Sequence, residues 1–211
     1  MVIVPKAWPG ATVVCLATGP SLTQADVDYC RGKARVIAVN DAIRLAPWAD
    51  ALYACDPKWW HWHKGVPSYA GPKWSLEHSA WRMHDHTYAD VQRLRNTGPG
   101  GLERVPTGLR TGRNSGYQAI NLAVHYGAVR ILLLGYDMQR PKGGPSHFFG
   151  EHPNRQQSPY DQFRRRFTSL APALVKLKID VINCTTRSAL ECFPKADLRE
   201  TLRAPAEAVA C

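Results

Sequence analysis

The chain has 211 residues, of which 45% are hydrophobic and 21% are charged, so its composition is that of a folded globular protein and excludes a disordered one. No apolar run approaches the roughly 18 residues of a membrane-spanning helix, and the N-terminus lacks the pattern of a secretion signal. The six cysteines are scattered and form no CxxC pair. We therefore expect a cytoplasmic protein without disulfides. The formal net charge of +10 favours a polyanionic partner such as nucleic acid, or a phosphate-bearing substrate.

The first predicted element is a strand over residues 12–17, followed by a turn of small residues. The strand is apolar without polar alternation, which is typical of a strand buried on both faces of a parallel sheet. Gly19 allows the backbone to pass close to a ligand, and Pro20 fixes the turn. Ser21 or Thr23 can cap the helix that follows. A strand, a tight turn and a helix N-terminus form a phosphate site, so the sequence predicts a protein that handles a nucleotide.

Two further strands are predicted at 35–39 and 51–54, and the stretch that follows has no clean period. We expect residues 57–104 to form an irregular insert rich in aromatic residues and histidine. Trp59 and Trp60 have three interpretations, which are packing in the core, stacking on a nucleobase or sugar ring, and, if exposed, a partner interface. A metal site is a further alternative, and the side chains that could supply its ligands are His61, His63, His78, His84, Asp85 and His86.

The second half of the chain returns to a regular pattern. Its predicted elements are a helix at 114–126, a strand at 130–134, a helix at 160–178, a strand at 180–184 and a helix at 196–202. A Gly- and Pro-rich loop at 136–159 is expected to be a lid, and it carries His147 and His152. This alternation predicts one α/β nucleotide-binding domain over residues 1–211. Its fold class is Rossmann-like, with a mostly parallel open sheet, helices on both faces, and a lid and an insert.

The predicted strands share one feature, because each of four strands ends in polar residues or glycine. Ligands of open α/β sheets bind at the carboxyl ends of the strands, so these residues predict a shared site. Ordinary turn chemistry is the alternative, since Asn, Asp and Gly also terminate strands for local reasons. The residues at the four ends are Thr18, Gly19, Pro20 and Ser21; Asn40 and Asp41; Asp56; and Gly135, Tyr136 and Asp137.

Four motifs in the order ATGPSL, AVND, NSGYQAINLAVHYGAVRILLLGYDM and HFFGEH resemble those of the bacterial CMP-sialic-acid-dependent sialyltransferases. The same order resembles a wider group that includes the archaeal 6-hydroxymethylpterin pyrophosphokinases, of which short members are frequent in tailed phages. The resemblance covers residues 12–56 and 112–194 and leaves the middle stretch without a counterpart. It implies a nucleotide-binding transferase.

The resemblance also implies roles for individual residues. Gly19, Pro20 and Ser21 would hold the phosphate or ribose of the nucleotide, and Asn40 would contact the nucleotide or sugar. Asn114, Ser115 and Gly116 would receive the nucleotide at a helix N-terminus. His152 would be the general base that deprotonates an acceptor hydroxyl, because the pKa of imidazole lies near working pH, and Tyr160 would donate a hydrogen bond to the leaving phosphate.

The sequence departs from the sialyltransferase pattern at two places. Thr18 stands where the family usually has Asn, so a hydroxyl replaces the amide that would contact the nucleotide. The lid motif has one residue more between its histidines than the pattern has, so His147 is a second candidate for the base.

These observations leave three functions open. The leading one is a glycosyltransferase that uses a CMP- or UDP-type sugar donor and requires no metal, with either a polyanionic acceptor, nucleic acid included, or a surface glycan. The second is a pyrophosphokinase that uses ATP and Mg²⁺, for which Asp41, Asp56 and Asp137 are the candidate ligands. The third is a nucleotide- or nucleic-acid-binding protein without catalysis.

Overall fold

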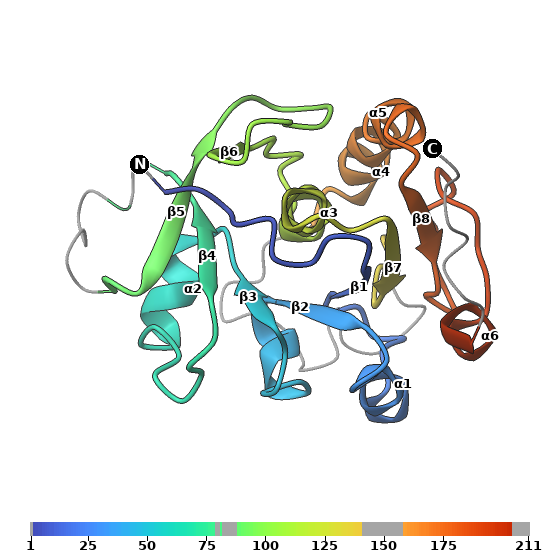
Figure 1. Cartoon of the computed structure of the whole chain (residues 1–211), viewed down its shortest axis with the longest axis horizontal. Helices are drawn as coiled ribbons and strands as arrows, with labels where there is room; N and C mark the ends of the chain where they lie inside the picture. Colours follow the sequence, from blue (N-terminus) through green and yellow to red (C-terminus); the bar gives the residue numbers. More distant parts are fainter. Residues whose placement is uncertain (1, 79–80, 82–87, 141–157, 204–211) are drawn as a thin grey trace.

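The computed structural model describes residues 2–78, 81, 88–140 and 158–203. Within these ranges, eight strands form one open sheet in the order β6-β5-β4-β3-β2-β1-β7-β8, and every neighbouring pair is parallel (Figure 1). The strands are β1 (Thr12–Leu16), β2 (Arg35–Val39), β3 (Ala51–Tyr53), β4 (Lys73–Leu76), β5 (Val91–Asn96), β6 (Gly108–Leu109), β7 (Arg130–Leu134) and β8 (Asp180–Asn183).

Helices cover both faces of the sheet, as the apolar strands require. In β1, Val13 and Cys15 belong to the core cluster under α3, whereas Val14 and Leu16 belong to the cluster on the opposite face. In Figure 1, α3, α4 and α5 lie on one side of the sheet and α1, α2 and α6 lie on the other. The helices are α1 (Gln24–Cys30), α2 (Pro57–Trp62), α3 (Ser115–Tyr126), α4 (Tyr160–Thr168), α5 (Ala171–Lys176) and α6 (Leu198–Arg203), with a short 3₁₀ helix, η1 (Asn40–Arg44), after β2. The Rossmann-like fold class is confirmed.

Residues 57–104, which we expected to be an irregular insert, contain α2, β4 and β5, and the two strands extend the sheet. Strand β4 has no apolar pattern because two of its four buried residues, Lys73 and Ser75, are polar. The ammonium group of Lys73 lies 2.5 Å from the carboxylate of Asp90, which compensates for its burial. A strand of this kind cannot be recognised from hydrophobic periodicity.

The predicted helix at 160–178 is two helices. Pro172 lies in the first turn of α5, where its missing N–H costs no hydrogen bond, but it cannot sit in the interior of a longer helix, so the helix breaks between Thr168 and Ala171. The predicted ends of α3 are confirmed. Asn114 caps its N-terminus, and Gly127 ends it in the left-handed conformation, with φ of 99°.

No helix in the described ranges is both long and apolar enough to cross a membrane. The five cysteines within these ranges carry free thiols. Most of the loop at 136–159, with His147 and His152, lies outside the described residues.

Candidate functional site

The chain order of the sheet reverses between β1 and β7, and the loops after these two strands meet. The amide of Ala17 donates to the carbonyl of Leu134 at 2.8 Å, and the amide of Gly19 donates to the carbonyl of Gly135 at 2.9 Å. The two loops therefore continue the hydrogen bonding of β1 and β7 beyond the carboxyl ends of these strands. In open α/β sheets this switch point is where ligands bind.

Glycine is required at the crossing of the two loops. A Cβ atom at Gly19 would lie 1.9 Å from a carboxylate oxygen of Asp137 and 2.4 Å from the carbonyl oxygen of Gly135. Gly135 itself has a φ of 71°, which side chains rarely adopt. The two loops therefore lie so close together that a side chain at Gly19 would collide with the other loop.

Asp137 holds the turn after β1 in place. Its carboxylate accepts a hydrogen bond from the hydroxyl of Ser21 at 2.9 Å and another from the amide of Ser21 at 3.2 Å. Only 6% of the residue is exposed. Burial raises the pKa of Asp137 above its ordinary value of 3.8, and the hydrogen bonds from Ser21 act in the opposite direction.

The raised pKa of Asp137 predicts a pH-dependent stability difference between the protein and its Asp137→Asn variant. Because the pKa is higher in the folded state, the folded protein still holds this proton above pH 3.8, where the unfolded chain has lost it. The free energy of unfolding therefore falls as the pH rises through the raised pKa. Asparagine has the same shape and does not titrate. We therefore expect the stability of the variant relative to the wild type to increase as the pH rises above 3.8. Urea unfolding at a series of pH values measures this, and a decrease would show that the fold favours the charged carboxylate.

The helix whose N-terminus faces the site is α3. The side chain of Asn114 accepts a hydrogen bond from the amide of Tyr117 at 3.1 Å and so caps the helix. Ser115 and Gly116 follow, and the first N–H groups of a helix have no partner within it, which suits an anionic ligand. We expected the helix after β1 to play this part, but α1 has only seven residues and none of them lines the cleft.

These elements enclose a cleft that gathers most of the residues proposed for the nucleotide. Residues of the loops after β1, β2 and β7 and of the N-termini of α3 and α4 line it. The proposed residues among them are Thr18, Gly19, Pro20, Asn40, Asn114, Ser115, Gly116, Asp137 and Tyr160. Ser21 is not among the residues that line the cleft, and its hydroxyl donates to Asp137. Sequence reasoning missed Met138 and Phe163, which line the cleft too; Phe163 was visible only as part of an apolar stripe on a helix.

Two carboxylates that we expected in the site at the carboxyl ends of the strands do not line the cleft. Asp41 accepts from the indole N–H of Trp59 at 3.4 Å and lies 3.1 Å from Nε2 of His63. Asp56 caps α2 by accepting from the amide of Lys58 at 2.9 Å. The magnesium ligands proposed for a pyrophosphokinase, Asp41, Asp56 and Asp137, are therefore not gathered in one site. In the part of the chain that the structure describes, no three His, Cys, Asp or Glu side chains form a group that could hold a metal ion.

The tryptophans of α2 belong to the core. Trp59 is 3% exposed and Trp60 is fully buried, and their rings meet edge to face with centroids 5.0 Å apart. The indole N–H of Trp60 donates to the carbonyl of Ala54 at 2.9 Å. Neither ring lines the cleft, so the geometry agrees with packing rather than with stacking on a ligand.

No protein-family model and no curated protein matches this chain. Among solved structures, the MAf glycosyltransferase from Magnetospirillum magneticum AMB-1 has a TM-score of 0.63 at 11% identity, over 94% of this chain and 35% of that chain. The sialyltransferase CstII from Campylobacter jejuni, solved with the substrate analogue cytidine-5′-monophosphate, has a TM-score of 0.49 at 15% identity, over 89% of this chain and 85% of that chain. This chain thus spans about a third of the length of the MAf glycosyltransferase, and the similarity shows that the two chains share an α/β fold over that part.

Proposed function

We propose that this protein is a glycosyltransferase that binds a nucleotide-activated sugar in the cleft and transfers the sugar to an acceptor hydroxyl. The observation that carries the proposal is the N-terminus of α3, which opens into the cleft where the turn at Gly19 and the end of β2 at Asn40 also lie. The glycosyltransferase-like fold supports it, as do the sequence motifs that resemble sialyltransferases. Those motifs make a CMP- or UDP-type donor the first choice.

In this proposal the phosphate of the donor lies against the first N–H groups of α3. Both Ser115 and Gly116 line the cleft, where Gly116 is buried and Ser115 is half-buried, so water is partly excluded from those groups and their attraction for an anion is strengthened. Asn40 has a φ of 52°, a conformation that asparagine tolerates well, and its amide side chain supplies a donor and an acceptor for the base or the sugar.

The reaction is a displacement at the anomeric carbon of the sugar. A bond forms from the acceptor oxygen to that carbon, the bond from the carbon to the phosphate oxygen breaks, and the acceptor proton passes to a base. His152 is proposed as this base, with His147 as the alternative; both lie outside the described residues. Tyr160 lines the cleft at the start of α4, where its hydroxyl can donate to the departing phosphate.

Binding of CMP or UDP without Mg²⁺ is the result expected from a thermal-shift titration. A ligand at 100 times its dissociation constant stabilises a protein by about 2.7 kcal/mol, which is easily detected. The matched variants are Asn114→Ala and Thr23→Ala. Each removes a helix cap and lowers the free energy of unfolding by about 1 kcal/mol. Only Asn114→Ala should weaken nucleotide binding, since α3 opens into the cleft and no residue of α1 lines it.

Three other outcomes have distinct meanings. Stabilisation by ATP only when Mg²⁺ is present would favour the pyrophosphokinase instead. Nucleotide binding without release of free nucleotide from CMP- or UDP-sugars, across a panel of acceptors, would indicate a binding protein. An equal loss of binding in Thr23→Ala and Asn114→Ala would remove the N-terminus of α3 from the site.

A further inference from the structure

A glycine-rich turn at residues 98–101 lies fixed beside the site. The amide of Thr111 donates to the carbonyl of Gly98 at 2.8 Å, which ties the turn to the segment before α3. On its other side, the amide of Gly101 donates to the hydroxyl of Ser169 at 2.9 Å, and the hydroxyl of Tyr117 donates to the carbonyl of Gly101 at 2.6 Å. The turn is therefore held between the start of α3 and the junction of α4 with α5.

Two guanidinium groups approach this turn from different elements. A Cβ atom at Gly98 would lie 2.7 Å from Nη1 of Arg110, and one at Gly100 would lie 3.6 Å from Nη1 of Arg166. Both cations also act on the hydroxyl of Tyr117, where they oppose the burial that raises its pKa. Within the described residues, the terminal nitrogens of Arg110 and the guanidinium of Arg166 have no hydrogen-bond partner.

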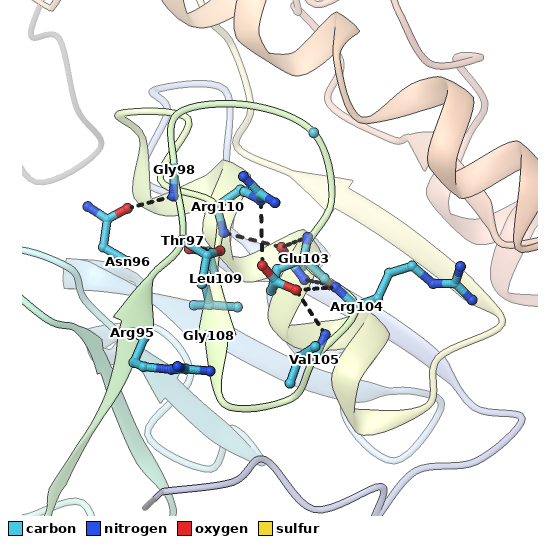
Figure 2. Close-up of polar contacts among 12 residues, drawn as sticks. Arg95, Asn96, Thr97, Gly98, Glu103, Arg104, Val105, Gly108, Leu109 and Arg110 are labelled. Carbon is cyan, nitrogen blue, oxygen red and sulfur yellow. Dashed lines mark hydrogen bonds and ion pairs between the residues drawn. The ribbon is translucent and has the colours of Figure 1, made fainter.

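Positive charge around the turn exceeds what its one acidic residue can neutralise. Oε1 of Glu103 accepts from the amides of Arg104 and Val105 at 2.9 and 3.0 Å, and Oε2 lies 3.6 Å from Nε of Arg110 (Figure 2). The side chain of Arg104 extends away from Glu103 in the same view. The arginines of this region that form no ion pair with any described residue are Arg95, Arg104, Arg113 and Arg166.

This basic surface continues the wall of the cleft. Tyr160 and Phe163 of α4 line the cleft, and Arg166 follows Phe163 by three residues, which is about 4.5 Å along the helix. Arg113 directly precedes Asn114, the cap of α3. A molecule that contacts Arg166 at the turn of residues 98–101 would therefore lie one helical turn from Phe163, in the wall of the cleft.

We propose that Arg110 and Arg166, at the turn of residues 98–101, bind a phosphate or carboxylate group of the acceptor and so place its hydroxyl in the cleft. Guanidinium groups match both oxyanions through paired N–H donors. The absence of side chains at Gly98 and Gly100 leaves the two cations accessible. This inference rests on the proposed function only in calling the anion an acceptor; the anion site itself does not depend on it.

The test is calorimetric titration of the full chain with two probes, inorganic tripolyphosphate and citrate, in the presence and absence of CMP. Arg166→Gln should weaken binding of the preferred probe about tenfold, the usual loss for a charged hydrogen-bond partner. Tighter binding of tripolyphosphate would identify the bound group of the acceptor as a phosphate, and tighter binding of citrate would identify it as a carboxylate. The matched control is Arg31→Gln, an equally charged change at an exposed residue after α1, near the amino end of β2, with an expected change below about twofold.

The proposal would be overturned if neither probe bound to the wild type, or if Arg31→Gln lost as much affinity for the probe as Arg166→Gln. It would also be overturned if Asn114→Ala lost affinity for the probe and Arg166→Gln did not, because the probe would then bind in the cleft. The proposed function fails separately. If the wild type binds tripolyphosphate through Arg166 but binds neither CMP nor UDP, the anion site stands and the glycosyltransferase does not.

Discussion

Gly19→Ala should abolish nucleotide binding and lower the free energy of unfolding by about 3 kcal/mol or more. The new Cβ atom would lie 2.4 Å from the carbonyl oxygen of Gly135, which is part of the backbone and cannot rotate away. Relief requires the two loops to separate, and separation breaks the hydrogen bond from Gly19 to Gly135 and those from Ser21 to Asp137. Urea unfolding and a CMP titration of the same variant measure the two effects.

The control for Gly19→Ala is Gly10→Ala. Gly10 has a φ of 75°, so alanine is strained there, but a Cβ atom would have no neighbour within 4 Å. The variant should lose about 1–2 kcal/mol from backbone strain and bind nucleotide normally. If Gly19→Ala were as mild as Gly10→Ala and still bound CMP, the close approach of the loops would not shape the site.

Asn121→Ala should lower the free energy of unfolding by about 3 kcal/mol. Asn121 is fully buried in α3, and its side chain bonds both backbone groups of Glu103: it accepts from the amide at 2.9 Å and donates to the carbonyl at 2.9 Å. Alanine removes both hydrogen bonds, and the two backbone groups of this half-buried residue lose these partners. Amide hydrogen exchange should become faster in residues 103–110, the segment that positions Arg110 beside the turn at 98–101.

An exposed amide serves as the control for Asn121→Ala. Gln92 lies on β5 with its side chain exposed, and Gln92→Ala should change stability by about 0.5 kcal/mol or less. A loss below about 1 kcal/mol for Asn121→Ala, or exchange that is unchanged at residues 103–110, would mean that water replaces the amide and that other contacts hold this loop.

The sequence was sufficient to predict the centre of the sheet but not its edge. β1, β2 and β7 are continuous apolar runs, and their recognition needs only local information. β4 escaped prediction because Lys73 is buried with a partner seventeen positions away, Asp90, and such a pairing is visible only in three dimensions. Pro172 marked the break between α4 and α5, but an apolar stripe across it gave the stronger helix signal.

Within the site, the position of a residue after a strand could be predicted, while the direction of its side chain could not. Asp41 and Asp137 both follow a buried strand, yet Asp137 lines the cleft and Asp41 faces Trp59. The difference arises because β2 leads directly into η1, whose turn carries Asp41 away from the edge. The sequence showed Arg110 only as one arginine of a basic stretch, because its proposed role depends on the path of the turn at 98–101.

The order of the strands decides when the site can form during folding. Each of the strands β1 to β5 pairs with the next strand along the chain, so this part of the sheet grows through short closures. β1 and β7 pair Thr12 with Arg130, across well over a hundred residues of intervening chain. Such a contact is slow to form and comes after the local ones. A chain emerging from the ribosome therefore completes most of its sheet before the two loops of the cleft can meet, and the N-terminus of α3 joins the cleft in the same late step.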